Sequence, residues 1–238
     1  MGWQSRSLPT TALDIQADRA DFLEFLVRGR LGEFIVYDLE FTAWPGSRQT
    51  NWSRPGEHRE IVQIGAVRVA PGRSCAEISC FERIVKPRIN PILSPYLIDL
   101  TGLSQERVDR EGVSFRQAMA DFRAFTGDPS TILAAFGGDA EIISENCALN
   151  RCAAVFLPAQ MLDIRPFIER ALAIEGQDVS SGELPLRLGY PPAGHAHDGL
   201  ADARAIAMAL RHIQSESRAL SRPGREDEAG VEDWYLWG

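Results

Sequence analysis

The sequence lacks long hydrophobic runs and has almost no lysine. No apolar stretch approaches the ~20 residues of a membrane-spanning helix, so we expect no membrane segment. Residues 1–20 also lack the basic start and the apolar stretch of a signal peptide, and we expect a soluble, cytoplasmic protein. Lys86 is the only lysine, and the net charge is −8. This acidic balance argues against a protein that coats long nucleic acids through charge.

Cysteines are few, and their spacing does not favour a zinc site. Cys75 and Cys80 are separated by four residues, as are Cys147 and Cys152, whereas most zinc ligands are more tightly spaced. We therefore interpret all four as free thiols, mostly buried, in a protein from a reducing compartment.

The hydrophobic content of 45% is enough for a sizeable core in a chain of this length. Residues 1–30 contain one amphipathic pattern, which predicts an N-terminal helical extension. Residues 31–216 carry the strand and helix patterns of a folded domain. Residues 217–238 are polar and acidic until their last few positions, so we expect a flexible tail there.

Strand and helix patterns follow one another along residues 31–216 in an order typical of α/β proteins. Three strands come first, and the second and third flank a PGR turn, which predicts a hairpin. A helix, a strand, a helix, a strand and further helices follow. The strands are expected in "FIVYDLEF", "EIVQIGAVRVA", "CFERIVKP", "TILAAFGG" and the start of "AQMLDIRPF". This order predicts an α/β fold with a mixed β-sheet flanked by α-helices.

Two acidic residues, Asp38 and Glu40, end the apolar run of the first expected strand. Side chains alternate across a strand, so residues two apart share a face. Two carboxylates on one buried face repel each other and favour a divalent cation between them, Mg²⁺ or Mn²⁺ above all. The alternative is a pair of solvated acids at a frayed strand end, because a D-x-E triplet is common by chance.

Further acidic residues begin two of the expected helices. Asp139 follows "LAAFGG" at the carboxyl end of a strand, where open α/β sheets place their sites. A plain N-cap is the alternative for this residue. Asp202 lies in the first turns of the last strong helix, five positions after His197. The alternative for His197 is an ordinary surface or capping histidine. His195 is a second candidate for a histidine of this motif.

Taken together, these residues resemble the ordered motifs of the DEDDh (DnaQ-like) 3′–5′ exonucleases. The D-x-E motif, the helix-opening aspartate and the H-x-x-x-x-D motif are matched by Asp38, Glu40, Asp139, His197 and Asp202. The spacing of the last motif selects His197 over His195. The stretches "EIVQIGAV", "FERIVKP", "LTGLSQERVD" and "SGELPLRLG" resemble the family as well. The resemblance covers about residues 34–213 and is closest to the branch of enhanced-RNAi and histone-mRNA-end exonucleases.

The resemblance implies a ribonuclease-H-like fold for residues 31–216 and a metal-dependent 3′–5′ exonuclease. It implies two Mg²⁺ or Mn²⁺ ions, about 3.5–4 Å apart, held by Asp38, Glu40, Asp139 and Asp202. Four carboxylates balance two divalent ions, which explains why a core strand tolerates these acids. His197 would take a proton from the attacking water, a role that suits a side chain titrating near neutrality. The expected partner is the 3′ end of a single-stranded nucleic acid, with RNA favoured over DNA.

The same resemblance implies three residues that contact the substrate. Phe41 and Thr42 would flank the terminal nucleotide, and Leu103 would wedge against a base. Aromatic and apolar faces stack on bases with little sequence choice. Ordinary packing is the alternative for Phe41 and Leu103.

Other functions stay open for this sequence. One is a domain of the same fold that binds nucleic acid or protein without cutting, and the presence of all five catalytic residues argues against it. Another is a metal-dependent phosphohydrolase of small nucleotides, which needs neither the "LTGL" segment nor binding of a strand end. A purely structural module leaves the two same-face acids unexplained.

Overall fold

The computed structural model describes Leu26 and residues 31–220. The predicted N-terminal extension, residues 1–30, therefore lies outside the described residues except for Leu26. Of the predicted acidic tail, residues 221–238 lie outside them. Within the described residues, no helix is both long and apolar enough for a membrane span.

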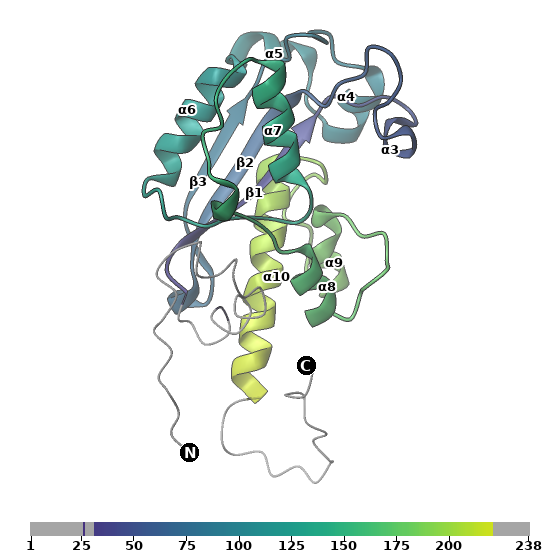
Figure 1. Ribbon diagram of the computed structural model, residues 1–238. Coiled ribbons are helices and arrows are strands. Elements are labelled where there is room, and N and C mark those ends of the chain that lie inside the picture. Colours follow the sequence, from purple (N-terminus) through teal and green to yellow (C-terminus); the bar gives the residue numbers. More distant parts are fainter. Residues whose placement is uncertain (1–25, 27–30, 221–238) are drawn as a thin grey trace.

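A mixed sheet forms the centre of the described residues (Figure 1). Its strands are β1 (Phe34–Phe41), β2 (Ile61–Ala70), β3 (Ala76–Ile84), β4 (Leu133–Ala135) and β5 (Met161–Asp163). Their order across the sheet is β3-β2-β1-β4-β5. The pairs β1–β2 and β2–β3 are antiparallel, whereas β1–β4 and β4–β5 are parallel. The predicted mixed sheet with an antiparallel hairpin at one side is thus confirmed.

Helices cover both faces of this sheet. They are α3 (Ser47–Thr50), α4 (Pro95–Thr101), α5 (Gln105–Glu111), α6 (Phe115–Thr126), α7 (Asp139–Leu149), α8 (Arg165–Ala171), α9 (Leu184–Arg187) and α10 (Gly199–Leu220). Three short 3₁₀ turns are η1 (Pro71–Arg73), η2 (Pro158–Gln160) and η3 (Ser181–Glu183). One apolar cluster joins the sheet to α8, α9 and α10, and another joins its opposite face to α6 and α7. Figure 1 shows the same layers, with α6 and α7 across the sheet from α10.

The central strand β1 is buried on both faces, with its side chains alternating between the two clusters. Phe34 and Val36 belong to the cluster under α10, whereas Ile35 and Tyr37 belong to the cluster under α6 and α7. By this alternation the even-numbered residues of β1 face α10. The acidic end of the strand therefore points toward the helix that carries the last predicted acid.

Two glycines allow α10 to begin directly against the sheet. Gly65 on β2 pairs with Asp38 on β1. A Cβ built on Gly65 would lie 2.1 Å from the backbone of Gly199 and Leu200. The Gln63 side chain reinforces the contact, because its Oε1 accepts a hydrogen bond from the Gly199 amide at 3.0 Å. The start of α10 is therefore fixed within backbone contact of the strand that neighbours β1.

Helix α10 continues beyond its predicted end. Residues 217–220, assigned to the tail by their composition, are helical. The Ser217 hydroxyl donates to the Ile213 carbonyl oxygen at 2.9 Å, which satisfies it within the helix. Ala219 and Leu220 are strong helix formers, so the polar composition does not end the helix here.

None of the four cysteines, all of which the structure describes, forms a disulfide, as predicted. Cys75 and Cys147 are buried, Cys152 is partly buried and Cys80 is exposed on the edge strand β3. The expectation of mostly buried thiols therefore holds for all but Cys80.

Candidate active site

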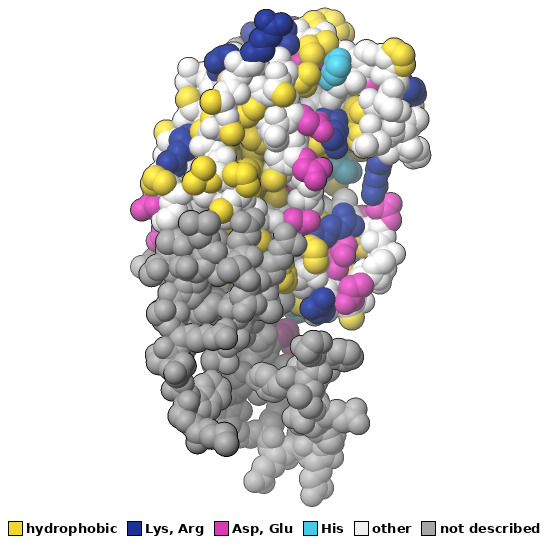
Figure 2. All heavy atoms as spheres, viewed as in Figure 1, with side chains coloured by type: hydrophobic (Ala, Val, Ile, Leu, Met, Phe, Trp, Pro, Cys, Tyr) yellow, Lys and Arg dark blue, Asp and Glu magenta, His cyan; other side chains and the backbone are white. Residues whose placement is uncertain are grey.

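A cleft of about 630 Å³ opens at the carboxyl end of β1. Its lining includes the five residues predicted to be catalytic, namely Asp38, Glu40, Asp139, His197 and Asp202. They come from β1, the start of α7, the loop before α10 and the first turn of α10. Figure 2 shows the surface hollowed between the part that carries α3 and α4 and the part that carries α8 and α9. The structure thus brings together residues spread over much of the chain.

Asp38 and Glu40 form the floor of this cleft from one face of β1. Their exposed fractions are 9% and 7%, so neither carboxylate is well solvated. Burial raises the pKa of both groups well above the usual range, and the negative charges of the neighbouring site carboxylates raise it further. The alternative of two solvated acids at a frayed strand end is therefore wrong. A positive charge nearby would favour the ionised form of such a pair.

Asp139 joins the site from the parallel side of the sheet. It follows β4, which pairs with β1, and it is the first residue of α7. Gly138 occupies the N-cap position, so the alternative of a plain Asp139 N-cap is also wrong. Burial raises the pKa of Asp139 to about 7, although backbone amides, including that of Leu39, donate to its carboxylate. The residue thus lies against the end of β1 and lines the same cleft as the other acids.

The hydroxyl group of Ser181 lies between the carboxylates of Asp202 and Asp38. The Ser181 Oγ lies 3.0 Å from Asp202 Oδ2 and 3.2 Å from Asp38 Oδ1. Asp202 is 2% exposed, and burial raises its pKa to about 6. Gly182 allows this close packing, since a Cβ there would lie 2.6 Å from Asp202 Oδ1. Ser181 therefore fixes the distance between an acid of β1 and an acid of α10.

His197 lies beside the carboxylates on the loop before α10. Its amide donates to Asp202 Oδ2 at 3.3 Å, and its φ of 62° is in the left-handed region. Burial lowers the pKa of its imidazole, and the positive charge of Arg48 lowers it as well. Ligand atoms of Glu40, His197 and Asp202 all lie within 4.8 Å of one another. His197 is thus close enough either to accept a proton in the cleft or to bind a metal ion there.

The donor atoms of the cleft fit divalent cations. Carboxylate oxygens are the ligands that Mg²⁺ and Mn²⁺ prefer. Asp38, Glu40 and Asp202 are buried and Asp139 is partly buried, and burial raises the pKa of all four carboxyl groups, which favours their neutral form. Bound cations would reverse those shifts by replacing the missing solvation. Asp38, Glu40, Asp139 and Asp202 all offer such oxygens in the cleft, and the ligand atoms that lie within 4.8 Å of one another are those of Glu40, His197 and Asp202.

A comparison with known protein families gives a match over most of the chain. The model of the exonuclease family RNase_T matches residues 35–210. The chain belongs to this exonuclease family. The resemblance to exonucleases, seen first in five separate residues, is thereby confirmed.

Curated relatives of this exonuclease chain bear out the predicted branch. ERI1 exoribonuclease 2 of Homo sapiens is 35% identical over 89 residues, which is 37% of this chain. ERI1 exoribonuclease 2 of Xenopus laevis is 30% identical over 91 residues, or 38% of the chain. Each match covers only 12% of the relative, so these proteins are much longer than the segment they share with this one.

Solved structures show the same fold. The nuclease domain of 3′hExo, described as a DEDDh family member bound to rAMP, has a TM-score of 0.64 at 22% identity, over 77% of this chain and 92% of that domain. Cell-death related nuclease 4 has a TM-score of 0.62 at 18% identity, over 78% of this chain and 64% of its own. The predicted ribonuclease-H-like fold is confirmed.

The three residues predicted to contact substrate have different environments. Phe41 lines the cleft, next to Trp52 at a ring-centroid distance of 5.4 Å. Thr42 is 2% exposed, and its hydroxyl accepts from the Glu60 amide at 3.0 Å and donates to the His58 carbonyl oxygen. The side chain of Thr42 is therefore occupied within the protein and does not line the cleft.

Leu103 also lies away from the cleft. It is 3% exposed and packs in an apolar cluster with Val62, Ile84 and Leu97. The interpretation of Leu103 as a wedge against a base is thus corrected to ordinary packing. The reason is that "LTGL" forms the end of α4 and the turn after it, which directs this leucine toward β2 and β3.

Sequence reasoning missed several residues of the cleft. Ser181 lies in the stretch "SGELPLRLG", whose resemblance to the family was noted without a role for the serine. Trp44, Arg48 and Trp52 lie in the long connection between β1 and β2 and also line the cleft. The closeness of two tryptophans to the D-x-E motif was the available signal, because exposed aromatic residues near a site are typical of base contacts.

Proposed function

We propose that the protein is a 3′–5′ exonuclease that hydrolyses the terminal phosphodiester bond of a single-stranded nucleic acid, using two Mg²⁺ or Mn²⁺ ions. The observation that carries this proposal is the convergence of four carboxylates and one histidine in a single cleft. The names of the curated relatives, exoribonucleases, favour RNA over DNA. The lining also includes Phe41 and two tryptophans, which can stack on bases without sequence choice.

The residues of the cleft have separate roles in this proposal. When bound, two divalent ions would supply the positive charge that a phosphodiester displacement needs. Asp38, Glu40, Asp139 and Asp202 would hold these ions, and the bridge through Ser181 sets the spacing of Asp38 and Asp202. His197 accepts the proton of the attacking water, and its lowered pKa leaves the imidazole neutral and ready to do so at pH 7.

A product ladder tests this function. We expect the purified protein to shorten a 5′-labelled single-stranded RNA one nucleotide at a time in Mg²⁺ or Mn²⁺ and to stop when a chelator is added. A 3′-labelled strand should lose its label in the first step. Parallel assays with duplexes, DNA and free nucleotides separate a strand-end nuclease from a nucleotide phosphohydrolase. Binding without shortening would instead support a non-cleaving domain of this fold.

A pair of variants on one helix controls for folding. Asp202→Asn should abolish cleavage with little change in thermal stability, because two-metal geometry fails as a unit. Glu216→Ala removes an exposed acid from the same helix and should cleave like the wild-type protein. Full activity of Asp202→Asn would exclude this site.

A further inference from the structure

Arg48 and Asp178 form an ion pair between the two walls of the cleft. Arg48 lies on α3, in the connection between β1 and β2, and Asp178 lies in the segment before η3, 130 residues later. Arg48 Nη2 is 2.6 Å from Asp178 Oδ1. Both residues line the cleft. The pair therefore joins the two walls of the space that leads to the carboxylates.

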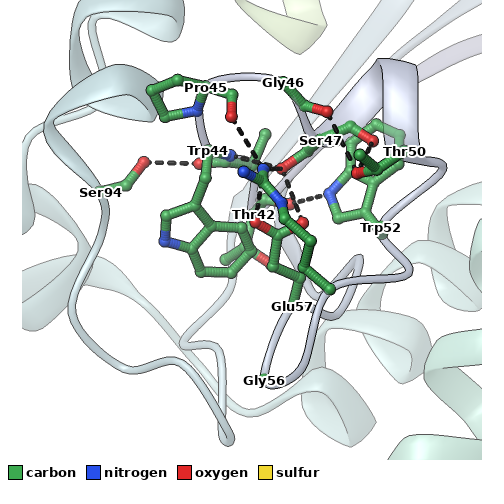
Figure 3. Close-up of polar contacts among 12 residues, drawn as sticks. Thr42, Trp44, Pro45, Gly46, Ser47, Thr50, Trp52, Gly56, Glu57 and Ser94 are labelled. Atoms are coloured by element: carbon green, nitrogen blue, oxygen red, sulfur yellow. Dashed lines mark hydrogen bonds and ion pairs between the residues drawn. The ribbon is translucent and has the colours of Figure 1, made fainter.

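The wall that carries Arg48 is held by hydrogen bonds of its own (Figure 3). The Ser47 hydroxyl accepts from the Trp44 amide at 2.9 Å and donates to Glu57 at 3.1 Å. Trp52 Nε1 donates to the Thr42 carbonyl oxygen at 2.9 Å. These hydrogen bonds fix the backbone on both sides of Arg48, and the exposed arginine side chain extends from this wall.

Of the two arginines that line the cleft, Arg48 has the partner that a ligand can displace more easily. The other, Arg165, donates to Glu169 at 2.6 Å, and its guanidinium lies 5.0 Å from the ring centroid of Phe136. The side chains of Arg48 and Asp178 are 72% and 73% exposed, and ion pairs this exposed contribute little to stability. A phosphate offers arginine a bidentate partner with stronger hydrogen bonds. A phosphate at this place would therefore displace Asp178.

The negative charge of the cleft would repel a nucleic-acid strand unless a positive side chain lies near its rim. Two divalent ions balance only the four carboxylates predicted to hold them, and Asp178 and Glu183 add further negative charge to the lining. A nucleic-acid strand carries one negative charge at each phosphate, so its approach needs a positive side chain near the rim. Arg48 lines the same cleft as His197. It is therefore close to the place where a strand end would react.

We propose that Arg48 binds a backbone phosphate of the strand that enters the cleft and that Asp178 competes with this phosphate for the guanidinium. The inference rests on the proposed function, since it names a phosphate contact of the same site. The inference predicts opposite effects on substrate binding for the two partners of the ion pair. Loss of Arg48 weakens substrate binding, whereas loss of the Asp178 charge strengthens it.

The test uses Arg48→Gln, which removes the guanidinium charge and keeps a polar side chain, and the isosteric Asp178→Asn. Affinity is measured by fluorescence anisotropy of a 5′-labelled single-stranded RNA in Ca²⁺, and kcat and KM are measured in Mn²⁺. We expect Arg48→Gln to raise Kd about tenfold and to reduce the slope of log K against log salt by about 0.7. Asp178→Asn should lower Kd about twofold. Both changes should appear in KM, with kcat close to the wild-type value.

A second exposed ion pair serves as the matched control. Arg204 Nη2 lies 3.0 Å from Glu77 Oε1, and neither residue lines the cleft. Arg204→Gln and Glu77→Gln should leave Kd and the salt slope unchanged. Equal changes of Kd in Arg48→Gln and Asp178→Asn would show that the pair only joins the two walls, and would overturn the inference while the nuclease function stands. A wild-type protein that neither binds nor shortens the RNA would overturn the proposed function itself.

Discussion

Replacing Gly65 by alanine tests how the site is assembled. The added Cβ would lie 2.1 Å from the carbonyl carbon of Gly199 and 2.1 Å from the nitrogen of Leu200. Ordinary van der Waals contact begins at 3.4 Å, so the strand and the helix would have to separate by about 1.3 Å. The atoms in the way belong to the backbone and cannot rotate aside as a flexible side chain would. Gly65→Ala must therefore move the start of α10.

The magnitude follows from packing and from the place of Asp202. Overpacking of a well-packed contact costs about 1–3 kcal/mol, and in a domain of this size Tm falls by about 2–4 °C for each kcal/mol. We therefore expect a fall in Tm of roughly 2 to 12 °C. Asp202 lies in the first turn of α10, and a displacement of about 1 Å can reduce catalysis about 100-fold. The loss of activity should thus exceed what the fall in stability explains at 25 °C.

The assay is thermal unfolding by circular dichroism together with initial rates on single-stranded RNA at 25 °C. Gly72→Ala is the matched control, because a Cβ on this exposed glycine would meet nothing within 4 Å. It should leave both Tm and rate unchanged. Wild-type Tm and wild-type activity in Gly65→Ala would refute the argument that the Gly65–Gly199 contact positions Asp202.

Three further predictions concern the carboxylates and their neighbours. His197→Ala should lower kcat about 10²–10⁴-fold and leave Mn²⁺ affinity by calorimetry unchanged, whereas a loss of affinity would make His197 a ligand. Ser181→Ala should lower Mn²⁺ affinity or activity about 10–100-fold, and wild-type values for both would deny it a positioning role. Burial raises the pKa of Asp202 to about 6 and that of Asp139 to about 7, above the usual 3.8. The folded protein therefore keeps protons that the unfolded chain has released, and in chelator Tm should fall as pH rises from about 4 to 7. Asp139→Asn should reduce this fall, and a Tm difference between the two proteins that does not change with pH would contradict it.

The local part of the site could be predicted because it depends on backbone periodicity. A strand places Asp38 and Glu40 on one face whatever surrounds it, and an apolar strand followed by a helix places Asp139 at a carboxyl end. The mixed sheet could be predicted for the same reason, since the strand and helix patterns and the PGR turn are local signals. Residue patterns that resemble a family then ordered these pieces into one site.

Contacts between distant segments could not be predicted in this way. The stretch "LTGL" does not say which way its second leucine points, and packing against β2 and β3 buries Leu103. Likewise Thr42 looked available beside the D-x-E motif, but its hydroxyl is bound to the segment before β2. In both cases the neighbours that decide the environment lie elsewhere in the chain.

The sequence by itself determined the chemistry of this protein, namely four acids and a histidine in the order and spacing of a nuclease, on elements whose type their own residues specify. The tertiary structure alone decided that Gly65 admits Gly199, that Ser181 bridges two of the acids, and that Arg48 meets Asp178 across the cleft. Periodicity and turn preference act over a few neighbouring residues. Close approach and charge pairing depend on which distant segments the packed core brings together.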